Sequence, residues 1–396
     1  MINPQYTEML KQKDIIFEIF QYALEKAKIV GADNILDFSL GNPSVPAPSV
    51  VNETLIAKIN SLNPLSLHGY SPGLGVPEAR AAIAESISRR FGVPYKVSNI
   101  YMTIGAADAL GHALRAVNCP GDEVICFAPC FSEYTPYMAG ARLVQRIVPA
   151  DIDTFQINFD EFEKMMNPKV TSVLINSPSN PSGTLYSEET LKHLAEILTR
   201  KSEEYGHPIY LISDEPYREL AYDGAVVPYV TKYYNNTIVG YSYSKSLSLP
   251  GERIGYIVIP DELEDAENVF AAASIATRVS GSVNAPSLMQ LVIEKCVDAQ
   301  CDVAAYDKNR NALYNGLTEL GFECIKPQGA FYLWMKTPVE EKEFVSKCKE
   351  YNILPVGGTS FACPGYVRFA YCVSYDTIMN SMKAFAKVAE FYGLKK

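Results

Sequence analysis

The middle of the chain alternates short apolar runs with longer amphipathic stretches. The short runs are rich in β-branched residues, are bounded by turn residues and predict strands; they cover residues 122–129, 170–177, 209–213, 237–242 and 254–260. The amphipathic stretches predict two helices, in which Pro77 suits the first helical position of one and Ser187 suits the N-cap of the other. This alternation predicts an α/β fold with a mostly parallel sheet covered by helices.

A second pattern begins near residue 285. One long helical stretch at residues 284–321 precedes two further strand-like runs and a helix, and together they predict a smaller α/β layer reached through a long helix. Residues 1–45 are too few to bury a core, so we expect them to fold onto this layer or to reach another subunit. The sequence thus predicts a large domain at residues 46–290 and a small domain formed by residues 291–396 and 1–45, the latter carrying an N-terminal arm.

Composition narrows the classes of partner. The 396 residues are 48% hydrophobic and 20% charged, which is typical of a well-packed protein, and their number favours two domains. A net charge of −10 argues against nucleic acid, which attracts basic surfaces. No apolar stretch approaches the roughly 20 residues of a membrane span, and the N-terminus has no continuous signal-peptide core. We therefore expect a cytoplasmic protein without a nucleic-acid or membrane partner.

The cysteines and histidines do not form a metal-binding pattern. The nine cysteines include no CxxC pair, and Cys126, Cys130 and Cys363 lie in apolar surroundings, so we expect reduced buried thiols. No histidine has metal-ligand spacing with a second histidine or a cysteine. The sequence therefore predicts no metal site. A Cys/His nucleophile stays open, although no pattern points to one.

Three of the predicted strands end in residues that can carry chemistry. The second strand leads into a turn with Asn180, the third into Asp214 and Tyr217, and the fourth into Lys245. Each residue has an ordinary explanation by itself, as a turn residue, a cap or a solvated surface lysine. Ligands, however, bind beyond the carboxyl ends of the strands in open parallel sheets. The common position of these residues therefore favours one shared site.

A phosphate-bearing aromatic aldehyde would use such a set. A lysine binds the aldehyde covalently, and an aspartate keeps a pyridine nitrogen protonated so that the ring accepts electrons. Lys245 and Asp214 suit these roles, while Tyr217 and Asn180 can hydrogen-bond a ring hydroxyl. Hydroxyl groups and a guanidinium that binds in a bidentate way would hold the phosphate. The sequence supplies these groups at Ser242, Ser244 and Arg253.

A second phosphate element is predicted where a strand-like run gives way to a helix. Gly105, Ala106 and Ala107 stand at this point, and the N–H groups of a helix N-terminus attract phosphate. Taken alone, the segment is explained equally well by an ordinary helix start. The glycine pair within residues 69–78 follows no strand, so it does not predict a dinucleotide-binding loop.

The order of these motifs resembles that of the class I/II aminotransferases, fold-type I enzymes that depend on pyridoxal 5'-phosphate, and in particular the aspartate aminotransferase-like members. The resemblance runs from about residue 35 to the C-terminus, and its most specific part is the SxSKxxxxPGxRxG pattern at residues 242–255. It implies that Lys245 binds the cofactor and moves the proton of the substrate Cα. It also implies cofactor contacts for the other members of the set, which are Asp214, Tyr217, Asn180, Ser242 and Arg253.

The resemblance extends to four residues elsewhere in the chain. It implies that Gly41 lies against the substrate carboxylate, that Phe131 stacks on the pyridine ring, and that Tyr70 reaches the phosphate of a neighbouring subunit in a homodimer. Arg368 matches the arginine that binds the substrate α-carboxylate. Without the resemblance, an arginine within an apolar strand is costly unless it binds an anion or forms an internal ion pair, and both readings stay open.

The implied reaction is a ping-pong transfer of an α-amino group between an L-amino acid and a 2-oxo acid. Arg278 resembles an arginine that binds the distal carboxylate across the subunit boundary in one subgroup, which would favour aspartate, glutamate and 2-oxoglutarate. The match needs a one-residue gap, and a solvated surface arginine is the alternative. Some members of the family have a hydroxyl residue or a lysine at the position of Ala107, so one contact to the phosphate or to a distal carboxylate is missing here. A neutral or aromatic amino donor, with 2-oxoglutarate as acceptor, is therefore the second candidate specificity.

Two other functional classes share this pattern. A carbon–sulfur β-lyase would use the same cofactor and the same lysine. A regulator built on this fold would need an attached DNA-binding domain, for which we expect no room in the short N-terminal segment. The transaminase remains the main prediction.

Overall fold

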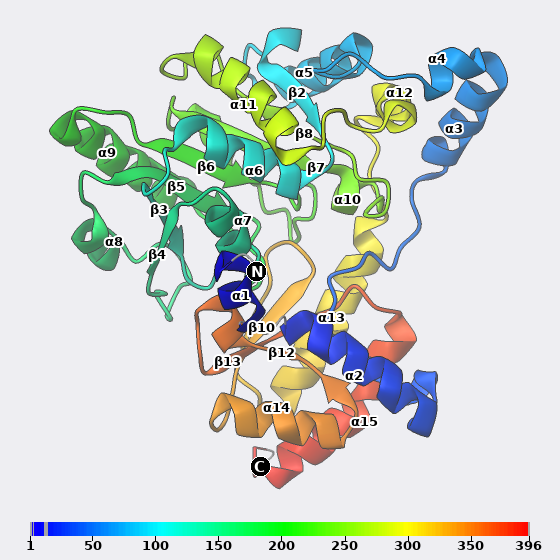
Figure 1. Cartoon of the computed structure of the whole chain (residues 1–396). Coiled ribbons are helices and arrows are strands. Elements are labelled where there is room, and N and C mark those ends of the chain that lie inside the picture. Colours follow the sequence, from blue (N-terminus) through cyan, green and yellow to red (C-terminus); the bar gives the residue numbers. More distant parts are fainter. Residues whose placement is uncertain (1, 3, 12–14, 395–396) are drawn as a thin grey trace.

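The computed structural model, which describes residues 2, 4–11 and 15–394, contains a larger and a smaller α/β part (Figure 1). The larger part is built on a seven-stranded sheet with the order β2-β8-β7-β6-β5-β3-β4. Strands β3 to β7 pair in parallel, whereas β8 runs antiparallel to both of its neighbours. The seven strands are β2 (Ile100–Thr103), β3 (Glu123–Phe127), β4 (Val144–Val148), β5 (Val170–Asn176), β6 (Tyr210–Asp214), β7 (Thr237–Ser242) and β8 (Gly255–Val258). The predicted α/β fold with a mostly parallel sheet is confirmed.

Helices cover both faces of this sheet. On one face, Leu174 of β5 packs in an apolar cluster with α6 (Ala106–Val117) and α11 (Ala266–Ser280). On the other face, Val173 and Ile175 of the same strand pack in a cluster with α9 (Glu188–Tyr205). Because successive strand residues are buried on opposite faces, the central strands appear in the sequence as continuous apolar runs.

Shorter helices complete the larger part of the molecule. Most of them connect consecutive strands or pack at the edges of the sheet; they are α3 (Ser49–Ser61), α4 (Pro64–His68), α5 (Pro77–Phe91), α7 (Tyr134–Gly140), α8 (Phe159–Met165), α10 (Tyr243–Ser246) and α12 (Ser287–Cys296). The predicted start of α5 at Pro77 and the predicted N-cap of α9 at Ser187 are confirmed, and the Ser187 side chain accepts a hydrogen bond from Thr190 N.

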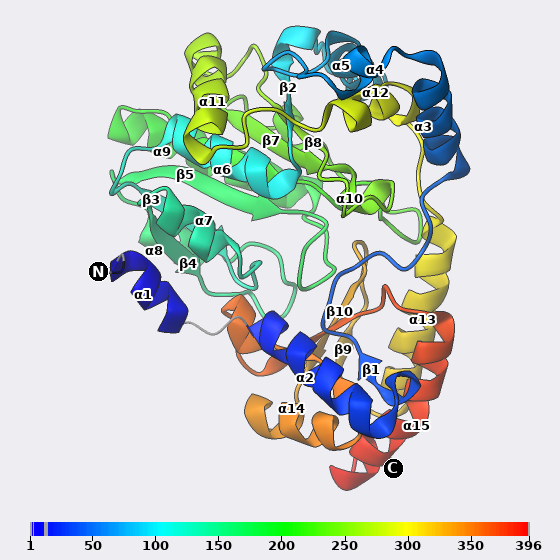
Figure 2. The ribbon, with the colours of Figure 1, turned by 45° about the vertical axis from the view of Figure 1, so that its right-hand side comes forward.

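The smaller part is built on a four-stranded antiparallel sheet with the order β12-β13-β10-β9. A second, two-stranded sheet pairs β1 of the N-terminal segment with β11, and α2 lies across this part in both ribbon views (Figures 1 and 2). The remaining elements are α1 (Pro4–Lys11), α2 (Ile15–Val30), β1 (Leu36–Asp37), α13 (Val303–Glu319), β9 (Cys324–Ile325), β10 (Tyr332–Lys336), α14 (Glu341–Glu350), β11 (Ile353–Leu354), β12 (Val356–Gly357), β13 (Tyr366–Ala370) and α15 (Tyr375–Phe391).

The N-terminal segment and the C-terminal elements thus lie in one part of the molecule. The domain boundaries at residue 46 and residue 291 stay a proposal. Residues 1, 3, 12–14 and 395–396 of the proposed small domain lie outside the described residues.

The single long helix predicted at residues 284–321 is wrong, because two helices, α12 and α13, occupy this stretch. The chain turns between them, and Cys301 N donates a hydrogen bond to Ser246 O at 2.7 Å. The Asp302 side chain then caps α13 by accepting from Ala305 N at 3.0 Å. The sequence on both sides of the turn has helical periodicity, so its pattern did not indicate the break.

Candidate active site

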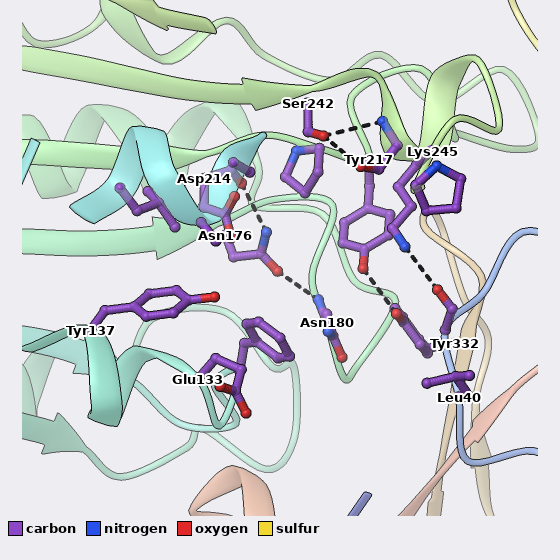
Figure 3. A pocket seen from close by; sticks show the side chains of 18 of the residues that line it. Leu40, Glu133, Tyr137, Asn176, Asn180, Asp214, Tyr217, Ser242, Lys245 and Tyr332 are labelled. Carbon is purple, nitrogen blue, oxygen red and sulfur yellow. Dashed lines mark hydrogen bonds between the residues drawn. The ribbon is translucent and has the colours of Figure 1, made fainter. Parts of the chain in front are cut away.

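The polar residues at the strand ends meet in one cavity. β5 ends at Asn176, β6 at Asp214 and β7 at Ser242, and Lys245 follows on the single turn of α10. Asn176 and Asp214 are register partners on neighbouring strands. Together with residues of the smaller part they line a cavity of about 560 Å³ (Figure 3).

Lys245 points its amine into this cavity. Its Nζ donates a hydrogen bond to the backbone oxygen of Gly41 at 2.8 Å, which links the larger part of the molecule to the N-terminal segment. Burial lowers the pKa of the Lys245 amine from 10.5 to about 8. A neutral amine is the nucleophilic form, so burial makes Lys245 far more reactive near neutral pH than a surface lysine.

Asp214 is a buried carboxylate with one oxygen unused. Tyr134 donates its hydroxyl to Oδ2 at 2.7 Å, while Oδ1 is buried and accepts no hydrogen bond from any described residue. Burial raises the pKa of Asp214 from 3.8 to about 7, although the Tyr134 hydrogen bond opposes this shift. A cationic N–H group at Oδ1 would restore the charged carboxylate, as the opposite-charge rule requires. The site therefore fits a protonated ring nitrogen.

The N-terminus of α6 and two neighbouring loops form a cradle for an anion. Gly105 caps α6 with a φ of 103°, and a Cβ at this position would lie 2.7 Å from a terminal nitrogen of Arg253. The hydroxyls of Ser242 and Ser244 lie 2.7 Å apart, and both residues line the cavity. The first N–H groups of a helix and a guanidinium attract a phosphate, so this end of the cavity fits the phosphate of the predicted cofactor.

Arg368 lies at another wall of the same cavity. Its side chain is 1% exposed, and one Nη donates to Asn180 Oδ1 at 2.8 Å while the other donates to Ser39 O. Within residues 2, 4–11 and 15–394, Arg368 forms no ion pair, and its Nε has no hydrogen-bond partner. The alternative of an internal ion pair is therefore wrong. A buried guanidinium without a counter-ion is suited to bind a carboxylate.

Two tyrosines and a phenylalanine shape the remaining walls. The hydroxyls of Tyr217 and Tyr332 lie 2.9 Å apart, and a Cβ on Gly41 would lie 2.0 Å from the Tyr332 hydroxyl. Phe131 lines the cavity and packs edge-on against Tyr134, with ring centroids 5.7 Å apart. Gly41 is therefore required by close packing, and Phe131 offers an aromatic wall.

Comparison with known proteins identifies the family. Residues 33–385 match the family described as aminotransferase class I and II. The chain belongs to this family. The crystal structure of an aminotransferase from Eubacterium rectale is 47% identical in sequence, with a TM-score of 0.96 over 99% of each chain. The aspartate/prephenate aminotransferase of Thermus thermophilus is 30% identical over 81% of this chain and 83% of its own length. An aromatic-amino-acid aminotransferase from Thermococcus litoralis is 27% identical over 90% of this chain and 92% of its own length.

This aminotransferase thus catalyses amino-group transfer, and the predicted enzyme class is confirmed. The comparisons do not favour the alternative of a carbon–sulfur lyase. The relatives are named for different substrates, so membership of the family leaves the side chain of the amino donor open.

The structure brings most of the predicted site residues of this aminotransferase together. The predicted residues that line the cavity are Gly41, Ala106, Ala107, Phe131, Asn180, Asp214, Tyr217, Ser242, Ser244, Lys245, Arg253 and Arg368, and Gly105 lies directly beside Arg253. Tyr70 and Arg278 lie outside the cavity, and both are exposed, Tyr70 to 96%. The loops that follow them are linked, because Asn284 Nδ2 donates to Ser71 O at 2.9 Å.

Sequence reasoning missed several residues of the aminotransferase cavity. Asn176 could have been found as the last residue of a predicted strand, and its side chain donates to Asp214 O and accepts from Asn180 N. Tyr134 does not line the cavity but donates to Asp214 Oδ2, and it has no motif of its own. Leu110, Glu133, Tyr137, Pro216 and Pro250 also line the cavity, and each lies close in sequence to a predicted residue. Phe20, Leu40 and Tyr332 reach it from other parts of the chain.

Proposed function

We propose that this aminotransferase binds pyridoxal 5'-phosphate in the cavity at the strand ends and transfers an α-amino group between an L-amino acid and a 2-oxo acid by a ping-pong mechanism. One observation carries the proposal: the amine of Lys245, the unpaired Oδ1 of Asp214 and the α6 N-terminus with Arg253 converge on one cavity. They match the aldehyde, the ring nitrogen and the phosphate of that cofactor.

Four residues at the cavity have tasks at the reacting centre in this mechanism. When bound, pyridoxal phosphate supplies an aldehyde and an electron-withdrawing ring. The Lys245 amine, which donates to Gly41 O in this structure, would hold the aldehyde. Once the substrate amine has displaced it from the aldehyde, the freed Lys245 amine would remove the proton from the substrate Cα as a general base. Asp214 holds the proton at the ring nitrogen. Arg368 and Asn180 bind the substrate α-carboxylate, so that the Cα–H bond faces the lysine.

The wall residues orient the ring and exclude water. Tyr217 and Asn180 would hydrogen-bond the ring hydroxyl, and Phe131 would offer an aromatic wall to the ring. Ser242, Ser244, Arg253 and the N–H groups of Gly105, Ala106 and Ala107 hold the phosphate. The roles of these residues rest on their positions around the cavity.

A half-reaction screen tests the proposal. The cofactor-loaded protein is mixed with single amino acids, and the change in cofactor absorbance is followed without an added 2-oxo acid. We expect absorbance to change once per active site and to reverse on addition of a 2-oxo acid. Continuous release of pyruvate from cystathionine would instead support the lyase, and absence of change with every amino acid would contradict the proposal.

The depressed pKa of Lys245 predicts how cofactor binding depends on pH. Since the amine titrates near pH 8, the rate at which the cofactor-free protein captures pyridoxal phosphate should rise about tenfold per pH unit below 8 and level off above it. Borohydride trapping at timed intervals between pH 6 and 10 measures this rate. A rate that keeps rising to pH 10 would assign the lysine an ordinary pKa.

We further propose a homodimer in which each subunit completes the site of the other. Tyr70 and Arg278 are exposed, and the loops that follow them are linked by the hydrogen bond from Asn284 to Ser71. Exposed apolar side chains lie near them in the sequence, at Leu65, Ile275 and Val279. A second copy would cover these side chains and bring Tyr70 to the phosphate end of the cavity. Sedimentation should show twice the mass of the chain.

In this dimer Arg278 would bind the distal carboxylate of an acidic substrate. Arg278→Ala should then raise the KM for aspartate about tenfold or more, because a charged hydrogen bond is lost, and should leave the KM for alanine and phenylalanine nearly unchanged. Arg200→Ala on α9 is the matched control, since its guanidinium pairs with Glu163 away from this surface. Equal effects on all three substrates would reject the role of Arg278 and favour a neutral or aromatic donor.

We also propose that the protein is cytoplasmic. All nine cysteines are free, seven of them buried, and such thiols are typical of a reducing compartment. Among the described residues, no helix is long and apolar enough to cross a membrane. Cell fractionation with antibody detection tests this proposal.

A further inference from the structure

Tyr332 brings the smaller part of the molecule into the active-site cavity. It lies on β10, is 2% exposed and lines the cavity. In the antiparallel pairing of β10 with β13 its register partner is Ala370, so Tyr332 shares a face of the sheet with Arg368, two positions along β13. None of the tasks at the reacting centre falls to Tyr332, which nevertheless contacts residues that perform them.

The hydroxyl of Tyr332 meets the cofactor end of the cavity. It lies 2.9 Å from the hydroxyl of Tyr217, and Figure 3 shows the hydrogen bond that joins them. It also lies directly against Gly41, because a Cβ at that position would collide with it. The carbonyl of Gly41 accepts the hydrogen bond from the Lys245 amine. The Tyr332 hydroxyl therefore touches both Tyr217 and the segment that holds the lysine amine.

The direction of the hydrogen bond between the two tyrosines follows from what Tyr217 has to do. Tyr217 has one hydroxyl proton, and when it donates this proton to the ring hydroxyl of the cofactor, its oxygen is left to accept from Tyr332. A hydroxyl that accepts one hydrogen bond becomes a stronger donor of the next. Tyr332 would thus fix the orientation of the Tyr217 hydroxyl and strengthen the hydrogen bond that Tyr217 makes.

The groups around the two tyrosines leave both hydroxyls protonated. Burial raises the pKa of Tyr332 to about 12 and that of Tyr217 well above its usual range. The positive charge of Arg368 opposes this rise at both hydroxyls, whereas Cys372 adds to it at Tyr332 and Asp214 adds to it at Tyr217. Both hydroxyls therefore keep their protons near neutral pH and are able to donate.

The ring of Tyr332 contacts the arginine at the other end of the cavity. The guanidinium carbon of Arg368 lies 4.6 Å from the ring centroid of Tyr332 and 4.8 Å from that of Phe361. Aromatic faces stabilise a buried guanidinium without neutralising its charge, as a carboxylate partner would. Two neutral oxygens, of Asn180 and Ser39, accept from its Nη atoms. The rings thus orient the guanidinium and leave its charge available to a substrate.

We propose that Tyr332 is a positioning residue of this aminotransferase with two separate tasks: its hydroxyl orients Tyr217 toward the ring hydroxyl of the cofactor, and its ring holds Arg368 in place for the substrate α-carboxylate. This inference rests on the proposed binding of pyridoxal phosphate in the same cavity. The two tasks belong to different atoms of one side chain, so different substitutions separate them.

Tyr332→Phe tests the hydroxyl, because it keeps the ring. The absorbance of the cofactor-loaded protein is titrated with base. Hydrogen bonds to the ring oxygen weaken its hold on the proton that it shares with the nitrogen of the bound Lys245, so they lower the pH at which this proton is lost. Tyr332→Phe makes Tyr217 a weaker donor, and the midpoint of the titration should therefore rise by about 0.5–1 pH unit.

The matched control for the hydroxyl is Tyr95→Phe. It removes a hydroxyl that donates to Thr231 Oγ1 at 2.7 Å, and neither of these two residues lines the cavity. The midpoint of the absorbance titration should stay unchanged in this variant. A midpoint that Tyr332→Phe also leaves unchanged would overturn the task of the hydroxyl.

Tyr332→Leu tests the ring, and the probe is propanoate, a carboxylate without an amino group. Calorimetric titration should show that Tyr332→Leu weakens propanoate binding about fivefold or more, whereas Tyr332→Phe weakens it less than about twofold. Phe361→Leu removes the second ring beside Arg368 and should weaken binding as well, which keeps the test informative if Tyr332→Leu does not fold. Equal affinity in the unchanged protein and the leucine variants would overturn the task of the ring.

These measurements separate the role of Tyr332 from the proposed function. If the unchanged protein bound no pyridoxal phosphate, the proposed function would fail, and the propanoate titration would still decide on the ring. If the protein bound the cofactor and neither the absorbance midpoint nor the propanoate affinity responded to the substitutions, only the role of Tyr332 would fail.

Discussion

Replacing Lys245 by alanine is expected to lower kcat by at least about a thousandfold and to abolish covalent attachment of the cofactor. The reason is that no other described amine lines the cavity, so nothing remains to bind the aldehyde or to remove the Cα proton. The measurements are steady-state transamination, single-turnover absorbance and mass spectrometry after borohydride reduction. The variant should still bind pyridoxal phosphate reversibly, because Arg253, Ser242 and the α6 N-terminus are unchanged.

Two comparisons make this expectation specific. Lys164→Ala removes an exposed lysine of α8 that pairs with Glu161, and it should leave turnover and covalent attachment intact. A small primary amine added to the Lys245→Ala protein should restore part of the proton transfer, because it supplies a base in the cavity left by the side chain. Full activity of Lys245→Ala would reject the proposed mechanism.

Replacing Arg368 by leucine is expected to lower kcat/KM about a hundredfold or more for every amino acid, including alanine. Arg368 is buried and has no counter-ion in the part of the chain that the structure describes, and its guanidinium already donates to Asn180 and Ser39. Without Arg368, the bidentate hydrogen bonds to the α-carboxylate are lost. The Cα–H bond is then no longer oriented toward Lys245. The measurement is kcat/KM for a series of amino acids with different side chains.

The control for Arg368 is a substrate that lacks the α-carboxylate. In the unchanged protein, ethylamine should react far more slowly than alanine, whereas in Arg368→Leu the two should become nearly equal. Arg368→Lys should be intermediate, because an ammonium keeps the charge but not the bidentate geometry. A loss confined to acidic amino acids would contradict the role, since it would place the distal carboxylate, not the α-carboxylate, at Arg368.

Much of the fold was predictable because its signals are local. The central strands are buried on both faces, so they appear as continuous apolar runs, and Pro77 and Ser187 mark helix starts by their own conformational preferences. The break between α12 and α13 was not predictable in the same way. It depends on the hydrogen bond from Cys301 N to Ser246 O, between residues 55 positions apart.

The cofactor end of the site was predictable for a geometric reason. Parallel strands end at the same edge of a sheet, so the residues after β5, β6 and β7 must lie near one another once the alternating pattern is recognised. Asn180, Asp214 and Lys245 are therefore placed by the sequence itself. The helix start at Gly105 joins them because α6 follows β2, which lies beyond β8 in the sheet and runs in the same direction as β7.

The substrate end of the site was decided by the tertiary structure. Tyr332, Leu40 and Phe20 belong to β10, the N-terminal segment and α2, and only the packing of the smaller part against the sheet brings them to Lys245. Nor does the sequence tell whether Arg368 has an internal counter-ion, because an ion pair depends on which side chains meet. The sequence by itself thus determined the α/β sheet and the residues that suit the cofactor. The tertiary structure decided that Arg368 has no counter-ion among the described residues and that Tyr332 and Leu40 reach the cavity, because both depend on contacts between segments far apart in the chain.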